Sequence, residues 1–198
     1  MNILLLSPYP EDLYGAFSLK ERYIVVREDL DIPCSDDGVQ FDWIISYGCR
    51  TIIKGKWLEK YKGKIINIHI GYLPWNRGAD PNFWSWFDDT PKGVSIHEID
   101  GGIDTGLLYS RAEIKFDNIR KETLRSSYKH LRAGAAFSFH ALWPSIRDGL
   151  VTPTPQPNTG GSYHRAIDKV KWFDHLPLEY DTPVSTIVEL GKRSRENV

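Results

Sequence analysis

Residues 64–78, KIINIHIGYLPWNRG, decide the fold, because a short β-branched run in this stretch ends in polar side chains. Residues 64–66 lie between a Lys- and Gly-rich turn and a Pro-Trp-Asn-Arg-Gly turn, which predicts a buried strand. On an extended strand Asn67 and His69 leave from the same face, while Ile68 points to the other. An amide and an imidazole therefore share one wall at the carboxyl end of a strand, where open α/β sheets bind ligands.

A second polar segment follows downstream. Residues 95–99, SIHEI, alternate polar and apolar and predict another strand. Residues 101–106, GGIDTG, then form a glycine-punctuated loop that can carry Asp104 close to another stretch of backbone. Together the two segments predict a site made of Asn67, His69 and Asp104.

Composition bounds the rest of the chain. Its 198 residues are 41% hydrophobic and 26% charged, which is ordinary for one compact globular domain. The formal net charge is -1, so no overall basic field favours nucleic acid or an anionic membrane as a partner. Cys34 and Cys49 have no disulfide or zinc spacing, and residues 2–6 predict a first strand rather than a signal peptide. We therefore expect a cytoplasmic protein without a metal.

Working outward from the site, the patterns predict a β-α-β sheet with small crossovers. Upstream they predict strands over 2–6, 23–27 and 41–48, one short helix over 11–20, a turn at 36–38 and the end of a helix at 57–61. Downstream they predict an aromatic helix over 82–87, a strand over 107–114 and a long helix over 121–146, capped by Thr123 or Asn118. The Pro-rich run 152–157 must be extended and cannot lie inside a sheet.

Three phrases carry a resemblance to a known family: DWIISYG at 42–48, NIHIGYLPWNRGADPNFWSW at 67–86, and TPKGVSIHEIDGGIDTG at 90–106. They resemble the catalytic core of the formyltransferases that use N10-formyltetrahydrofolate. The resemblance implies an α/β, Rossmann-like core over 1–150 whose N-terminal half is shortened, because the third strand is reached early. Residues 151–198 would form a Pro-rich C-terminal extension that packs on the core or in a dimer interface.

The resemblance also implies roles for individual residues. Asn67, His69 and Asp104 match the catalytic triad of the family. The folate co-substrate, N10-formyltetrahydrofolate, would contact the backbone of Cys49, Arg50, Thr51, Ile52, Gly101, Gly102 and Ile103. The acceptor substrate would contact Tyr72, Arg77, Tyr163 and His164, although Arg77 could instead be a structural ion-pair partner, and Tyr163 and His164 could merely anchor the extension.

Formyl transfer to an amine explains why these residue types are needed. Neutral His69 can remove a proton as the amine nitrogen attacks the formyl carbon. The Asn67 amide can donate a hydrogen bond to the resulting oxyanion, a contribution of about 3 kcal/mol for one well-placed donor. Asp104 could orient and stabilise the imidazolium or hold a water that relays the proton to the folate. The residues leave these two roles of Asp104 open.

The acceptor substrate is indicated by other segments of the chain. Members that act on initiator tRNA carry a further C-terminal domain, which we do not expect here. Members that act on glycinamide ribonucleotide carry a glycine-rich phosphate loop, whereas residues 7–12, SPYPED, offer prolines and acids. PNFWSW at 81–86 and GGSYHR at 160–165 look most like the sugar N-formyltransferases, which act on nucleotide-linked amino deoxysugars for surface glycans such as lipopolysaccharide O-antigen. We expect this activity in a homodimer.

Two other classes stay open. A formyltetrahydrofolate hydrolase would use a similar site on water, and a non-catalytic module would bind folate or a nucleotide sugar without turnover. Among neighbouring residues, we expect His97 to be structural or surface-exposed and Trp84 and Trp86 to be core residues. Cys49 is not expected to be a nucleophile, because nothing beside it would lower its pKa.

Overall fold

The computed structural model of the chain describes residues 1–27, 40–176 and 178–196. Its strands are β1 Asn2–Leu6, β2 Tyr23–Arg27, β3 Trp43–Tyr47, β4 Ile65–His69, β5 Arg77–Gly78, β6 Gly93–Glu98, β7 Leu108–Glu113 and β8 Tyr163–His164. Its α-helices are α1 Lys56–Lys60, α2 Pro81–Phe87, α3 Leu124–Arg147, α4 Ala166–Val170 and α5 Val184–Glu196. Short 3-10 turns lie at Pro10–Asp12, Tyr14–Ala16, Ile119–Lys121, Phe173–His175 and Glu179–Asp181. Cys34 and the turn expected at 36–38 lie outside the described residues.

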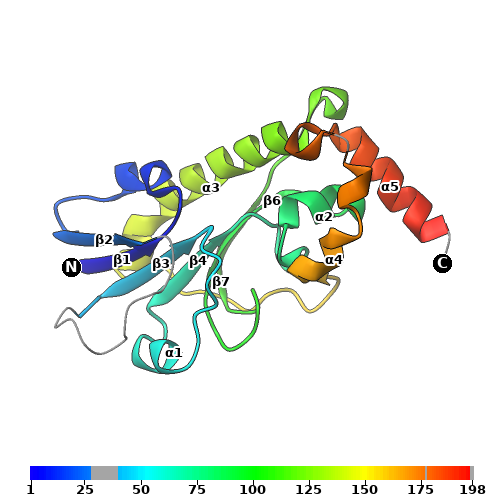
Figure 1. Ribbon diagram of the computed structural model, residues 1–198. Helices are drawn as coiled ribbons and strands as arrows, with labels where there is room; N and C mark the ends of the chain where they lie inside the picture. Colours follow the sequence, from blue (N-terminus) through cyan, green and yellow to red (C-terminus); the bar gives the residue numbers. More distant parts are fainter. Residues whose placement is uncertain (28–39, 177, 197–198) are drawn as a thin grey trace.

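A six-stranded sheet in the order β2-β1-β3-β4-β6-β7 forms the centre of the molecule (Figure 1). β2, β1, β3 and β4 run parallel, whereas β6 and β7 are antiparallel to their neighbours. Ile3, Leu4, Leu5 and Leu6 of β1 are all fully buried, as expected for a parallel strand covered on both faces. Figure 1 shows α3 on one side of the sheet and α1 on the other. The predicted α/β, Rossmann-like class is confirmed.

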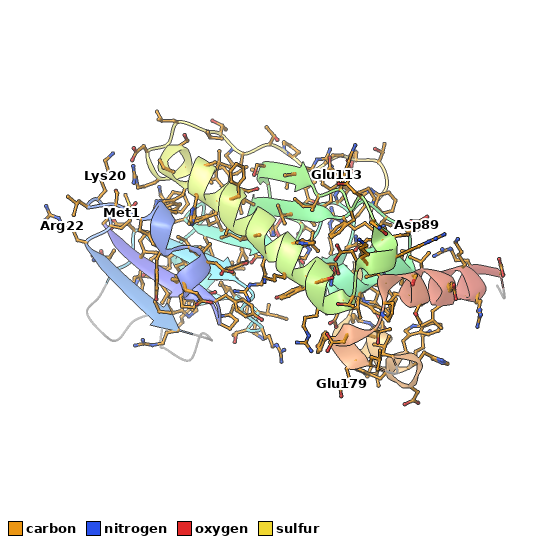
Figure 2. All side chains as sticks on the ribbon, turned by 90° about the horizontal axis from the view of Figure 1, so that it is seen from above. Met1, Lys20, Arg22, Asp89, Glu113 and Glu179 are labelled. Carbon is orange, nitrogen blue, oxygen red and sulfur yellow. The ribbon has the colours of Figure 1, made fainter. Side chains whose placement is uncertain are left out.

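The long helix α3 supplies most of the cover on its side of the sheet. Seen from above, it crosses the strands obliquely (Figure 2). Its residues Leu131, Ala135, Phe139 and Trp143 pack in one cluster with the inward side chains of β1, β3, β4 and β6. The Thr123 side chain accepts a hydrogen bond from the N–H of Ser126 at 3.1 Å, so of the two expected caps Thr123 is the one used.

A second apolar cluster joins α2 to α5 at the other end of α3. It contains Phe83, Trp84, Trp86, Phe87, Leu124, Leu176, Val184 and Ile187. The two helices approach closely at Gly191 of α5, where a Cβ would lie 1.8 Å from the carbonyl oxygen of Phe87. The expectation that Trp84 and Trp86 are core residues is confirmed.

The helix expected over 11–20 was wrong. The chain there forms two 3-10 turns, Pro10–Asp12 and Tyr14–Ala16. Its side chains are held by partners outside the segment: the Asp12 carboxylate accepts hydrogen bonds from Arg132 of α3 and from the Tyr47 hydroxyl. A Cβ on Gly15 would lie 3.0 Å from the His140 ring. These tertiary contacts outweigh the weak helix propensity of a short segment that contains Gly15 and follows Pro10.

The chain beyond residue 150 returns along the sheet before it reaches α5. Thr154 exchanges two backbone hydrogen bonds with Leu108, at 2.7 and 2.8 Å, at the start of β7. β8 then pairs in parallel with β5. A domain boundary at residue 150 stays a prediction.

Candidate functional site

The polar wall predicted on β4 exists, and β6 extends it. Ile66 and Ile68 of β4 are buried in the cluster beneath α3, so Asn67 and His69 point to the opposite face. In the antiparallel register Asn67 lies opposite His97 and His69 lies opposite Ser95. Four polar side chains therefore line one face of two neighbouring strands, on the side of the sheet away from α3.

Asp104 is brought onto this wall by the loop between β6 and β7. Its backbone is left-handed, with φ of 52°. Two residues later the loop passes so close to β6 that a Cβ on Gly106 would lie 1.9 Å from the carbonyl oxygen of Glu98. Only glycine permits that approach.

The Asp104 carboxylate is the centre of the site. Its Oδ2 accepts a hydrogen bond from the N–H of Gly78 at 2.8 Å and lies 3.6 Å from His69 Nδ1. Its Oδ1 accepts from the Asn67 amide at 3.2 Å and lies 3.3 Å from His97 Nε2. The predicted trio of Asn67, His69 and Asp104 is thus brought together.

Electrostatics keep this carboxylate ionised. Burial by itself would raise the pKa of Asp104, but the two imidazoles and the Gly78 N–H stabilise the anion more strongly. The net result is a pKa well below the usual range of an aspartate. The Asp104 side chain is therefore ionised at neutral pH.

One ring nitrogen of His69 is held by the backbone. Its Nε2 lies 2.9 Å from the carbonyl oxygen of Asn76, and a carbonyl oxygen can only accept, so Nε2 carries a proton. Nδ1, the other ring nitrogen, faces Asp104. The ring has room because residue 71 is glycine: a Cβ there would lie 2.5 Å from His69 Nε2.

His97 belongs to the candidate site, although the sequence analysis did not place it there. It is 1% exposed, so of the two expected positions, structural or surface-exposed, the surface-exposed one is wrong. Its Nδ1 donates to the carbonyl oxygen of Glu98 at 2.7 Å, and its Nε2 lies 3.3 Å from the Asn67 amide nitrogen as well as close to Asp104. The alternation of residues 95–99 was a usable signal, but the register that sets His97 opposite Asn67 is not contained in it.

The four residues expected to contact the acceptor lie around the turn after β4 and on β8. The Arg77 guanidinium donates to the Gln156 side chain, at 2.6 and 3.3 Å, and within the described residues it forms no ion pair. His164 stacks on Trp84, with ring centroids 3.8 Å apart, and its Nε2 lies 2.7 Å from the Asp88 carboxylate. Tyr163 is half exposed, and the Tyr72 ring lies under the Arg111 guanidinium. His164 therefore ties the extension to α2, and substrate contact by these residues stays a prediction.

The two segments expected to receive the folate begin at a common apolar cluster. Cys49 after β3 and Ile99 after β6 both pack against Leu4, Leu6, Ile44 and their neighbours. Ile52 is 62% exposed, and Gly101 and Gly102 are exposed as well. Cys49, Arg50, Thr51, Ile52, Gly101, Gly102 and Ile103 thus lie in accessible loops, and their contact with folate stays a prediction.

Over the described ranges, no group of His, Cys, Asp and Glu side chains is arranged to hold a metal ion. No helix in the same ranges is long and apolar enough to span a membrane.

Comparison with known proteins identifies the family. A model of the formyl transferase family matches residues 32–136, which is more than half of the chain. The chain belongs to the formyl transferase family. It matches the formyl transferase PseJ from Anoxybacillus kamchatkensis, whose crystal structure holds UDP-4,6-dideoxy-4-formamido-L-AltNAc and tetrahydrofolate. The identity is 40% and the TM-score 0.86, with 96% of this chain and 100% of that chain covered.

Two curated members of the formyl transferase family show the breadth of the similarity. Methionyl-tRNA formyltransferase of Myxococcus xanthus is 35% identical over 77% of this chain and 46% of its own length. The dTDP-4-amino-4,6-dideoxyglucose formyltransferase of Mycobacterium tuberculosis is 29% identical over 65% of this chain and 53% of its own length. The chain thus spans about half the length of these curated relatives.

Proposed function

We propose that this chain transfers the formyl group of N10-formyltetrahydrofolate to the amine of a nucleotide-linked amino deoxysugar. The observation that carries the proposal is the convergence of Asn67, His69 and Asp104, with His69 Nδ1 3.6 Å from the Asp104 carboxylate. The similarity over nearly the whole chain to PseJ, whose structure holds a UDP-linked formamido sugar and tetrahydrofolate, supports this choice of donor and acceptor class.

The proposed chemistry begins at the acceptor nitrogen. The neutral amine attacks the formyl carbon, and His69 Nδ1 accepts the proton that the nitrogen loses. The ionised Asp104, 3.6 Å away, stabilises the imidazolium that forms. Collapse of the tetrahedral intermediate breaks the bond between the formyl carbon and N10, and the proton passes to N10 of the departing tetrahydrofolate. The products are the formamido sugar and tetrahydrofolate.

Asn67 is proposed as the donor to the tetrahedral oxyanion, and its geometry adds a condition. Its amide nitrogen donates to Asp104 at 3.2 Å and lies 3.3 Å from His97 Nε2, so both contacts of this nitrogen are within the site. One of these contacts must be exchanged for the formyl oxygen when the folate binds. The Asn67 amide would then stabilise the charge that develops in the transition state.

The test is release of tetrahydrofolate, followed spectrophotometrically, from N10-formyltetrahydrofolate with a panel of acceptors. The panel contains UDP- and dTDP-linked amino sugars, glycinamide ribonucleotide and charged initiator tRNA. We expect release that depends on one amino sugar and that is abolished in His69→Ala. His130→Gln, an exposed histidine of α3 outside the site, is the matched control and should keep wild-type activity.

The same assay separates the other functions. Formate release without any amine would show a hydrolase, and dependence on tRNA or glycinamide ribonucleotide would move the acceptor to another class. Folate binding without release in any mixture, equal in His69→Ala and wild type, would show a binding module. Each of these results would overturn the proposal.

We further propose that the enzyme is a homodimer. The extension exposes several large apolar side chains, namely Ile167, Val170, Phe173, Leu178 and Tyr180. Apolar area of this kind on one segment is typical of a contact surface. Light scattering at several protein concentrations should give twice the mass of the chain, and a monomer throughout would contradict it.

A further inference from the structure

A segment far from the catalytic motifs in sequence runs beside them in space. Residues 151–165, called here the crossing segment, contain prolines at 153, 155 and 157, which restrict the backbone before any contact is made. The paired hydrogen bonds between Thr154 and Leu108 fix its position next to the β6–β7 loop. The side chain two residues further along, Gln156, is therefore delivered to the loop that carries Asp104.

Gln156 uses both ends of its amide. Its nitrogen donates to the carbonyl oxygens of Asp104, at 2.8 Å, and Gly106, at 3.0 Å. Its oxygen accepts from the guanidinium of Arg77 at 2.6 Å. Among side chains of this size, only an amide combines two N–H donors with an acceptor, so glutamine matches the position chemically.

Gln156 acts on an unfavourable stretch of backbone. Asp104 has a left-handed backbone, with φ of 52°, which is disfavoured for a residue with a side chain. Its carboxylate is held from β5 by the N–H of Gly78, and its main chain is held by Gln156, which is itself bound to Arg77 of β5. The side chain and the main chain of Asp104 are thus both anchored to β5, the former by Gly78 and the latter through Arg77.

The crossing segment also supports the residue that holds His69. Ser162 accepts a hydrogen bond from the N–H of Asn76 at 2.9 Å, and Asn76 supplies the carbonyl that fixes His69. Parallel pairing of β8 with β5 closes the same turn. The crossing segment therefore touches the supports of both His69 and Asp104.

We propose that Gln156 is a positioning residue that sets the distance between Asp104 and His69. The role in turnover rests on the formyl transfer proposed above, whereas the role in ordering the loop does not. Gln156 acts through the backbone of the loop, because its amide nitrogen binds the carbonyl oxygens of Asp104 and Gly106.

The sharpest variant is Gln156→Glu, which keeps the shape and the oxygen facing Arg77 but replaces the two donors with an acceptor. A carboxylate oxygen next to the carbonyls of Asp104 and Gly106 is repelled, so the loop loses its anchor while the Arg77 contact is kept. The matched control is Gln40→Glu, the same change at an exposed position away from the site.

Two measurements are made on the full chain. The first is hydrogen exchange without ligands, in which Gln156→Glu should exchange amides of residues 99–107 at least about tenfold faster than wild type, with the strands of the sheet unchanged. The second is steady-state kinetics with the acceptor found above: kcat should fall about tenfold or more, a larger factor than the change in KM for the folate.

The outcomes separate the two proposals. Faster exchange in residues 99–107 without turnover in wild type would support the positioning role and overturn formyl transfer. Turnover in wild type with unchanged exchange and unchanged kcat in Gln156→Glu would overturn the positioning role alone. If Gln156→Glu unfolds at the assay temperature, Gln156→Met, which has similar length and no charge, should give the same two effects, and wild-type behaviour of that variant would refute the role.

Discussion

Asn67 of β4 and His97 of β6 lie directly opposite each other and converge on the same oxygen of Asp104, at 3.2 and 3.3 Å. The pair covers one edge of the carboxylate, and His69 and the Gly78 N–H cover the other. Asp104 therefore meets four polar partners from three separate strands, β4, β5 and β6, and the charge that would stabilise an imidazolium at His69 is shared with a second imidazole.

Replacing the His97 imidazole with an apolar ring should lower turnover without unfolding the protein. His97→Phe deletes the contacts to Asn67 and Asp104 while keeping a planar ring at this buried position. A hydrogen bond to a charged group contributes about 1.5–3 kcal/mol, so kcat should fall roughly ten- to a hundredfold. Steady-state kinetics will check this, with His130→Gln as control. Wild-type kcat in His97→Phe would mean that the histidine fills space only.

A methyl group at residue 71 should disable His69 through space. The Cβ of Gly71→Ala would lie 2.5 Å from His69 Nε2, closer than side-chain carbons approach one another, so the imidazole must turn away from Asn76. We expect at least a tenfold loss of kcat with folate binding preserved. Gly63→Ala, a site with no neighbour within reach of a Cβ but with positive φ, controls for backbone strain of the chain. Equal kinetics in the two variants would contradict the expectation.

Replacing Asp104 with asparagine should reduce turnover at every pH between about 5 and 9. The pKa of Asp104 lies well below that range, so wild-type protein has the same charge there throughout. Because an amide cannot stabilise the imidazolium electrostatically, the loss should be at least about a hundredfold. The check is a pair of pH–rate profiles. A loss confined to the alkaline side would show that Asp104 is protonated in the working enzyme.

The ion pair between Glu21 and Arg147 should make the free energy of unfolding depend on pH in the acid range. Burial would raise the pKa of Glu21, but hydrogen bonds from Arg147, Ser18 and Trp143 outweigh it and lower the value from 4.5 to about 2. Since the folded-state pKa is the lower one, ionised Glu21 stabilises the fold above pH 4.5, and this contribution is lost as the pH falls toward 2.

Glu21→Gln should therefore lower the free energy of unfolding by about 2 kcal/mol at pH 7, and the difference from wild type should shrink in that acid window. Urea titrations at a series of pH values measure it. Glu11→Gln, whose side chain is 63% exposed beside Arg132, should change stability little. A difference that grows on acidification would reverse the sign of the assignment.

The parts of the site that follow from strand periodicity could be predicted from the sequence. Asn67 and His69 share a face because they are two residues apart, and Asp104 needed only a glycine-rich loop to reach them. The α/β class follows from the same short apolar runs. These features depend on local patterns, which a single sequence contains.

The features that could not be predicted depend on pairing between distant segments. His97 entered the site through the register of β6 on β4, and Gln156 through a crossing that a Pro-rich run does not specify. The prediction of a helix over 11–20 was wrong for a related reason, because Arg132 of α3 binds the Asp12 carboxylate. In each case a tertiary contact decides what the local pattern leaves open.

The alternation along β4 ties inheritance of the fold to inheritance of the chemistry. Ile66 and Ile68 fill the core under α3, whereas Asn67 and His69 lie on the opposite, polar face of the strand. Deletion of one residue in this strand would exchange the two faces, so isoleucines would face the site and an amide and an imidazole would be buried under α3. Variation among descendants of this gene should consequently spare the spacing of residues 65–69. Substitutions that change the acceptor should accumulate in the loops and the crossing segment, where no alternation of side chains between two faces has to be kept.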